Sequence, residues 1–120
     1  MKIVERSFNF SVEIVFLYKF LVKKNEYVLS KQILRSGTSV GANIEEAQAG
    51  QSKRDFIAKM SIASKEARET NYWLRLLKAT NYLDDYQKVD FLFKESESII
   101  NIVTKIVKTS QENLKTGVKL

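Results

Sequence analysis

The sequence predicts an all-α protein folded as an antiparallel up-down-up-down four-helix bundle. The 120 residues include no Pro and only 4 Gly, so long helices are not interrupted and few residues suit the tight turns of a β fold. Apolar residues recur at every third or fourth position along four segments, which is the period of an amphipathic helix. The connections between these segments are short, as in bundles whose successive helices run antiparallel.

The whole chain, residues 1–120, fits one domain, because typical domains have about 50–250 residues. The first helix is expected over residues 5–24 and carries two apolar lines. One line passes through Phe8, Val12 and Phe16, and the other through Phe10, Ile14, Leu17 and Leu21. A helix that is apolar on more than one side is usually buried on several sides. In so small a protein, we expect the extra apolar side to meet another subunit.

The second helix is expected over residues 30–49, with Ser30 as its N-cap and Gly50 as a left-handed residue at its end. Gly37 and Gly41 lie four residues apart inside it. Gly costs about 1 kcal/mol relative to Ala in a helix, so we interpret this pair as a point of close helix–helix approach. A phosphate-binding loop is excluded because no Lys follows Gly41 and no strand precedes it.

Asn43 falls in the apolar part of the second helix. A buried Asn needs hydrogen-bond partners and can fix the register of neighbouring helices. Binding of a ligand is the alternative interpretation.

The third helix is expected over residues 53–80, with Ser52 as its N-cap and Asn81 at its end. The fourth is expected over residues 86–113, capped by Asp84 or Asp85. Its apolar residues repeat with the spacing of helices that pack as in a coiled coil.

Positive charge is concentrated in the third helix. The chain has 20 Lys and Arg against 14 Asp and Glu, a net charge of +6. Residues 51–81 hold seven basic and three acidic side chains, whereas residues 82–120 hold six of each. A basic balance favours an acidic partner such as nucleic acid.

A helical projection sorts these charges to different sides of the third helix. One arc, the basic stripe, consists of Arg54, Lys65, Arg68, Tyr72 and Arg75. A second, acidic–aromatic arc contains Asp55, Glu66, Glu69 and Trp73. Arg binds phosphate with paired N–H donors, and Tyr can stack on an unpaired base. Two alternatives remain: a solvated face with pairs such as Asp55–Lys59 and Lys65–Glu69, or complementary halves of a subunit interface.

Several classes of function are excluded by composition. The chain has no His and no Cys, which removes disulfides, imidazole or thiolate zinc sites and His-dependent nucleophiles. We therefore expect no enzyme, no metal site and no cofactor. No apolar run reaches the about 20 residues that span a bilayer, and the N-terminus does not resemble a signal peptide. We expect a cytoplasmic protein without membrane contact.

The second and third helices carry a family resemblance. Its motifs are Ser39-Val40, Ala42-Asn43-Ile44, Phe56-Ile57, Lys65-Glu66-Ala67, Glu69-Thr70 and Tyr72-Trp73-Leu74. The stretch from Ser36 to Leu77 resembles the bacterial four helix bundle protein family, also called the 23S ribosomal RNA intervening-sequence protein family. Many members read NIAEG followed by Gly-Arg, whereas this chain reads Asn43-Ile44-Glu45-Glu46-Ala47.

The resemblance implies a four-helix bundle without catalysis. Members are similar to the accessory protein of diversity-generating retroelements, a basic homopentamer that associates with a reverse transcriptase and nucleic acid. The resemblance therefore implies a homo-oligomer, with a pentamer as the expected form. Combined with the basic stripe, it predicts binding of structured RNA. The alternative is a protein–protein adaptor that uses the acidic–aromatic arc or the apolar first helix.

Overall fold

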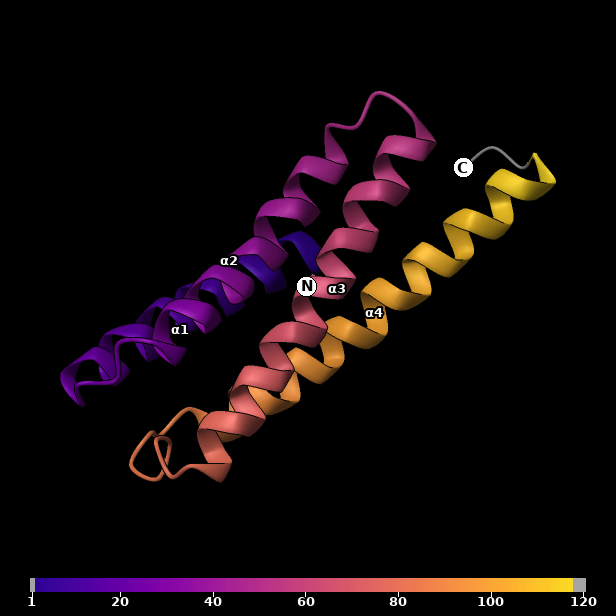
Figure 1. Ribbon diagram of the computed structural model, residues 1–120. Helices are drawn as coiled ribbons and strands as arrows, with labels where there is room; N and C mark the ends of the chain where they lie inside the picture. Colours follow the sequence, from indigo (N-terminus) through magenta and orange to yellow (C-terminus); the bar gives the residue numbers. More distant parts are fainter. Residues whose placement is uncertain (1, 118–120) are drawn as a thin grey trace.

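The computed structural model describes residues 2–117, which fold into four helices and, within that range, no strand. The helices are α1 (Ile3–Lys23), α2 (Leu29–Gln48), α3 (Lys53–Ala79) and α4 (Val89–Thr116). They form an elongated antiparallel bundle (Figure 1) that measures 51 × 23 × 20 Å. The predicted all-α four-helix fold is confirmed. None of the helices within residues 2–117 is long and apolar enough to cross a membrane.

Each helix packs mainly on its neighbours in the sequence. The contacts of α2 with α1 and α3, and of α3 with α4, are extensive, whereas α1 touches α4 over a short region. In Figure 1, α4 diverges from α3 toward the end of the bundle where α3 begins and α4 ends. The two helices therefore pack along most of their length and separate at this end.

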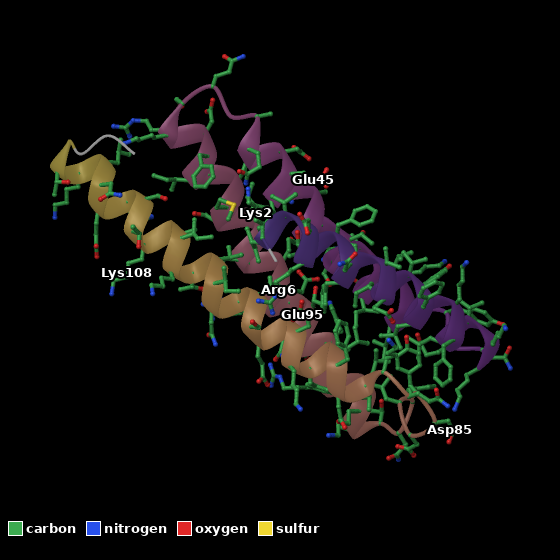
Figure 2. The ribbon with its side chains drawn as sticks, turned by 180° about the vertical axis from the view of Figure 1, so that it is seen from behind. Lys2, Arg6, Glu45, Asp85, Glu95 and Lys108 are labelled. Carbon is green, nitrogen blue, oxygen red and sulfur yellow. The ribbon has the colours of Figure 1, made fainter. Side chains whose placement is uncertain are left out.

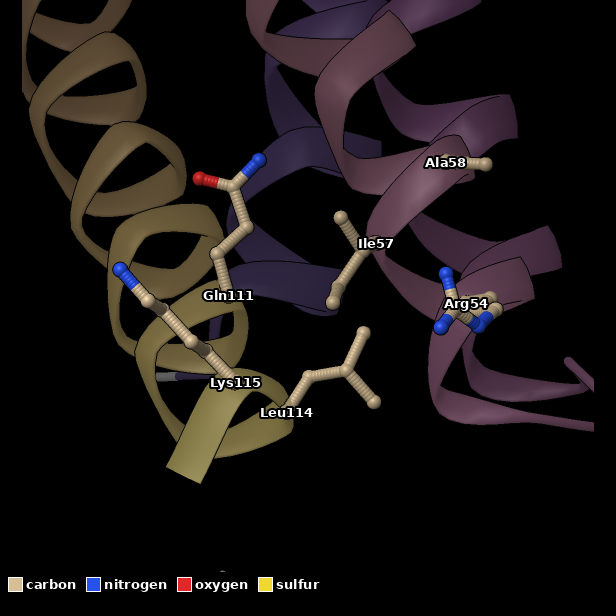
Figure 3. Close-up of a pocket in the computed structure, with 6 residues that line it drawn as sticks. All are labelled: Arg54, Ile57, Ala58, Gln111, Leu114 and Lys115. Atoms are coloured by element: carbon tan, nitrogen blue, oxygen red, sulfur yellow. The ribbon is translucent and has the colours of Figure 1, made fainter. Parts of the chain in front are cut away.

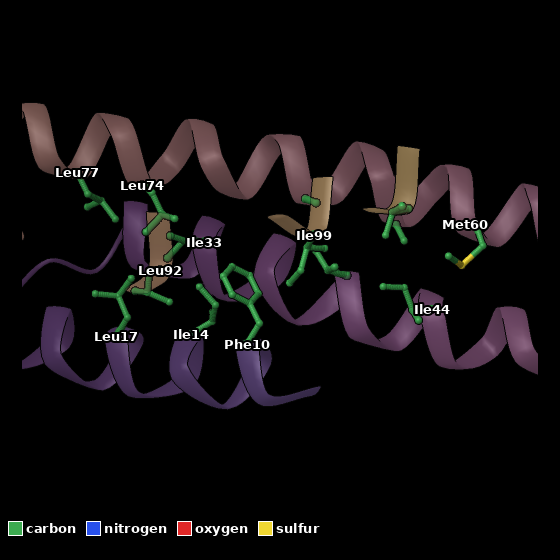
Figure 4. Packing of buried hydrophobic residues seen from close by; sticks show 14 of the residues in the cluster. Phe10, Ile14, Leu17, Ile33, Ile44, Met60, Leu74, Leu77, Leu92 and Ile99 are labelled. Atoms are coloured by element: carbon green, nitrogen blue, oxygen red, sulfur yellow. The ribbon is translucent and has the colours of Figure 1, made fainter. Parts of the chain in front are cut away.

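The core is formed by one side of each helix (Figure 4). In α1 the buried line is Phe10, Ile14, Leu17 and Leu21. The other apolar line of α1 lies at the surface, where Phe8 is 57% and Phe16 51% exposed. The two lines recognised in the sequence therefore divide between the core and solvent in the single chain.

The helix bounds differ from the predicted ones by no more than three residues. Ser52 caps α3, since its hydroxyl accepts a hydrogen bond from the Asp55 N–H at 3.1 Å. Asn81 has a φ of 70° directly beyond α3, a left-handed conformation that Asn tolerates and that stops a helix.

Three predicted helix ends are wrong. Ser30 lies inside α2, and the Glu26 carboxylate instead accepts hydrogen bonds from three backbone N–H groups, those of Val28, Leu29 and Ser30. Neither Asp84 nor Asp85 caps α4, which begins after Lys88 without a side-chain cap. Gly50 does not have a positive φ, whereas Gly117 does, at 77° after α4. A carboxylate one turn before a helix satisfies its free N–H groups as well as a Ser hydroxyl does.

Gly37 and Gly41 lie where α2 crosses α1. A Cβ at Gly37 would lie 2.7 Å from Ile14 Cγ2, and one at Gly41 would lie 3.0 Å from Ser11 Oγ and 3.2 Å from the Ser7 carbonyl oxygen. A contact as short as that at Gly37 essentially never occurs for a real Cβ, so the approach of the two helices requires glycine there. At Gly41 an added Cβ would need its neighbours to shift by a few tenths of an ångström.

We predict that Gly37→Ala destabilises the bundle. The new methyl group would overlap Ile14, which is fully buried and branched at Cβ and therefore cannot turn aside. We expect the free energy of unfolding to fall by about 1–2 kcal/mol, measured by urea denaturation. At an open helical site the same change stabilises by about 1 kcal/mol, so an increase in stability would contradict the close approach.

Candidate nucleic-acid interface

The basic stripe occupies the solvent-facing side of α3, next to α4. All five of its side chains are exposed: Arg54, Lys65, Arg68, Tyr72 and Arg75. Within residues 2–117, none of its four cations lies within 4.0 Å of a carboxylate. The positive charge of this surface is therefore not neutralised by ion pairs within the described chain.

Neutral groups hold the guanidinium groups of the stripe in place. Arg68 donates a hydrogen bond to the Thr104 hydroxyl of α4 at 2.9 Å. Arg75 donates to Asn71 Oδ1 at 3.1 Å and lies 5.7 Å from the centre of the Tyr72 ring. These contacts orient the cations without removing their charge, and each guanidinium keeps further N–H donors for a ligand.

Two carboxylates of the acidic–aromatic arc, Glu66 and Glu69, face α2 and pair with Arg35. The Arg35 guanidinium donates to Glu66 at 3.1 Å and also to Glu69. Glu66 is only 7% exposed. The Trp73 indole N–H donates to the same oxygen of Glu69 as Arg35 does, Oε2, at 3.0 Å. The Trp73 hydrogen bond, followed by that of Arg35, holds the pKa of Glu69 below its usual value.

The pairs expected within α3 do not form. Lys59 pairs with Glu46 of α2 at 2.9 Å, not with Asp55, and Glu69 pairs with Arg35, not with Lys65. Packing of α2 on α3 brings these partners closer than the spacing along a single helix does.

The remaining ion pairs connect the first helix to the last part of the chain. Arg6 binds the Glu95 carboxylate through two nitrogens (Figure 2), Glu13 lies 3.9 Å from Lys88, and Lys24 lies 3.0 Å from Asp85. In the part of the chain that the structure describes, ion pairs thus join α2 to α3 and α1 to the start of α4, but none crosses from α3 to α4. Within residues 2–117, the four cations of the basic stripe thus have no carboxylate partner on α4.

The fourth helix adds two cations that the sequence analysis missed. Lys108 and Lys115 are exposed, and both line hollows between α3 and α4. Lys108 projects outward from α4 in Figure 2. Residues 82–120 hold equal numbers of acidic and basic side chains, so a charge count of this segment does not reveal the two lysines. The signal was their spacing of seven residues, which places two side chains on one face of a helix.

The buried polar contact between α2 and α3 is not made by Asn43. Asn43 is half-buried and donates to the Ser39 carbonyl oxygen of its own helix at 2.8 Å. The Thr70 hydroxyl instead donates to Ser36 Oγ across the interface at 2.9 Å, and both residues are fully buried. Two small hydroxyl side chains therefore form the polar link that the sequence suggested for an amide.

The described residues hold no group of three or more acidic side chains that could bind a metal ion. The fold and this surface define a class of protein: a small helical bundle with a basic stripe that no ion pair neutralises within residues 2–117.

The chain belongs to the 23S rRNA-intervening sequence protein family, whose model matches residues 1–108. It is also similar to the crystal structure of a protein of unknown function from the S23 ribosomal protein family of Bacteroides thetaiotaomicron. The two share 49% sequence identity with a TM-score of 0.84, and the match covers 89% of this chain and 99% of the other. No match was found among curated proteins.

Proposed function

We propose that this protein is a non-enzymatic, oligomeric RNA-binding bundle whose basic stripe contacts the phosphates of structured RNA. Arg54, Lys65, Arg68 and Arg75 supply the charge, and Tyr72 offers a ring on which an unpaired base can stack. The observation that carries the proposal is the absence of ion pairs at these four cations within residues 2–117. Cations that are exposed and unpaired need not break an internal contact when they bind phosphate.

The family adds support of a different kind. Its description refers to a sequence that intervenes in 23S rRNA, which is a link to RNA but does not identify a ligand. The composition argues in the same direction, because a chain without His or Cys lacks the side chains most often used in catalysis.

The alternative function, a protein–protein adaptor, would need the acidic–aromatic arc to be free for a partner. The carboxylates of Glu66 and Glu69 are already held by Arg35, so a protein partner would have to displace an internal ion pair to use them. What remains for protein contact is the exposed apolar line of α1.

We propose that this line of α1 joins copies of the chain. Phe8 is 57% exposed, Val12 37% and Phe16 51%, and together they form a continuous apolar row along the helix. Rows of this kind usually mark a protein interface. A ring of subunits, a pentamer by family resemblance, repeats the basic stripe around its circumference and strengthens binding through multivalency.

Reversing two charges of the stripe tests the RNA proposal. We expect Arg68→Glu combined with Arg75→Glu to weaken binding of a labelled RNA hairpin with an unpaired loop about tenfold or more. Phosphate contacts are lost and replaced by repulsion in this variant. Fluorescence anisotropy at constant salt measures the affinity, and circular dichroism checks the fold.

The matched control carries Lys23→Glu and Lys31→Glu, two exposed lysines without an ion pair in the described residues. This control changes the net charge by the same amount on α1 and α2. We expect it to bind far more tightly than the stripe variant. Equal affinities for the two variants would mean that only net charge matters, and would contradict a site on α3.

Removing the apolar row tests assembly. Light scattering is expected to give the protein a mass of about 70 kDa, five times the 13.9 kDa of the chain. Phe8→Asp combined with Phe16→Asp should reduce this to the mass of a monomer with unchanged helix content, since both rings are exposed in the single chain. Tyr27→Ser, at an aromatic residue 52% exposed outside the row, should leave the mass unchanged. A monomeric native protein would overturn the proposal.

A further inference from the structure

A groove runs between α3 and α4 beside the basic stripe. Two hollows form it, one of about 590 Å³ and one of about 220 Å³. Gln111 lines both hollows, so they lie next to each other along the seam. The groove lies at the end of the bundle where α4 diverges from α3 (Figure 1).

The groove is lined by apolar side chains at its floor and by cations at its edges. Half-buried Ile57, Val107 and Leu114 form an apolar floor, and Figure 3 shows Ile57 and Leu114 pointing into the space between the helices. Arg54, Lys108 and Lys115 are exposed at the edges. Cations at the rim above an apolar floor suit a ligand with a charged backbone and flat, weakly polar rings.

Four uncharged hydrogen-bonding side chains also line the two hollows, two of them half-buried and two exposed. These are Ser61, Ser64, Thr104 and Gln111. Ser64 and Thr104 lie 3.4 Å apart across the seam, while the side chains of Ser61 and Gln111 have no hydrogen-bond partner within residues 2–117. Among the described residues that line the two hollows, none is a carboxylate. The groove thus offers free donors and acceptors and no charge that repels phosphate.

The dimensions of the groove distinguish an unpaired strand from a duplex. The two hollows hold about 590 Å³ and about 220 Å³, which is too little space for a rigid duplex to enter. A duplex could touch the rim cations but could not reach the floor or the hydroxyl groups. An unpaired strand is narrow and flexible, and its bases are free to stack on apolar surface.

We propose that the α3–α4 groove binds an unpaired segment of RNA, with phosphates at the rim, ribose hydroxyls at Ser61, Ser64 and Gln111, and base faces on the apolar floor. This inference rests on the proposed RNA-binding function and names the part of the RNA that this side of the molecule takes. Hydrogen bonds to the 2′-hydroxyl are what distinguish RNA from DNA, so the groove favours RNA over DNA of the same sequence.

The test blocks the groove without changing its charge. Ser61→Leu combined with Gln111→Leu adds bulk at the level of the hydroxyl groups and removes two hydrogen-bonding side chains. Anisotropy is measured with three probes: an unpaired RNA of about 12 nucleotides, DNA of the same sequence, and the blunt RNA duplex. Gln32→Leu, at an exposed glutamine of α2, is the matched control.

The native protein should bind the unpaired RNA more tightly than either the DNA or the duplex. The blocked variant should lose about tenfold in affinity for unpaired RNA and bind the duplex as the native protein does, while Gln32→Leu binds all three probes normally. Equal binding of unpaired RNA and duplex by the native protein would overturn the inference. So would native affinity for unpaired RNA in the blocked variant.

The inference and the proposed function fail separately. If the blocked variant binds normally but Arg68→Glu with Arg75→Glu does not, the stripe binds RNA and the groove does not. If neither variant differs from the native protein, both are wrong.

A measurement on the native protein removes any dependence on how the variants fold. Photo-crosslinking of 4-thiouridine RNA should label peptides from residues 54–64 and 104–115, and labelling confined to other peptides would contradict the groove.

Discussion

The pairing of Arg35 with Glu66 and Glu69 determines which side of α3 keeps its charge. One guanidinium on α2 holds both carboxylates, with Trp73 as a further donor to Glu69. Without this cation, two acidic groups would lie partly buried and unpaired, at a substantial cost in free energy. With it, both carboxylates have a cationic partner on α2 and one of their two negative charges is compensated, whereas the basic stripe has no carboxylate partner among the described residues. The difference in charge between the two sides of α3 is thus increased by an internal contact.

The helices α1 and α2 pack closely on one side of the bundle, whereas α3 and α4 separate at one end. Gly37 and Gly41 let α1 and α2 approach so closely that Ile14 and Ser11 occupy the space of the missing side chains. The α3–α4 pair is joined near the middle by hydroxyl and guanidinium contacts, such as Arg68 to Thr104, and separates toward the end of α4. The groove and the basic stripe share this seam, so the hollows and the unpaired positive charge lie side by side.

The sequence predicts the fold well because three local signals agree. These are the helical period of the apolar residues, the absence of Pro, and the presence of small residues where α1 and α2 cross. It predicts the stripe because Arg54, Lys65, Arg68 and Arg75 belong to a single helix with a known period. What it misses depends on contacts between helices. The role of Arg35 requires knowledge that α2 packs on the acidic side of α3, and the roles of Lys108 and Lys115 require knowledge that α4 flanks the other side. Glu26 was missed as a helix cap because its carboxylate acts from outside the usual capping position.

The most direct test of the account is the salt dependence of RNA binding by the native protein. Each phosphate contact releases counterions, so the logarithm of the affinity should fall linearly with the logarithm of salt concentration. Four stripe cations in contact with phosphate predict a slope of about −3 or steeper. A titration that gives this slope supports an unpaired basic surface as the site of binding. Binding that is independent of salt, or absent at low salt, would contradict it.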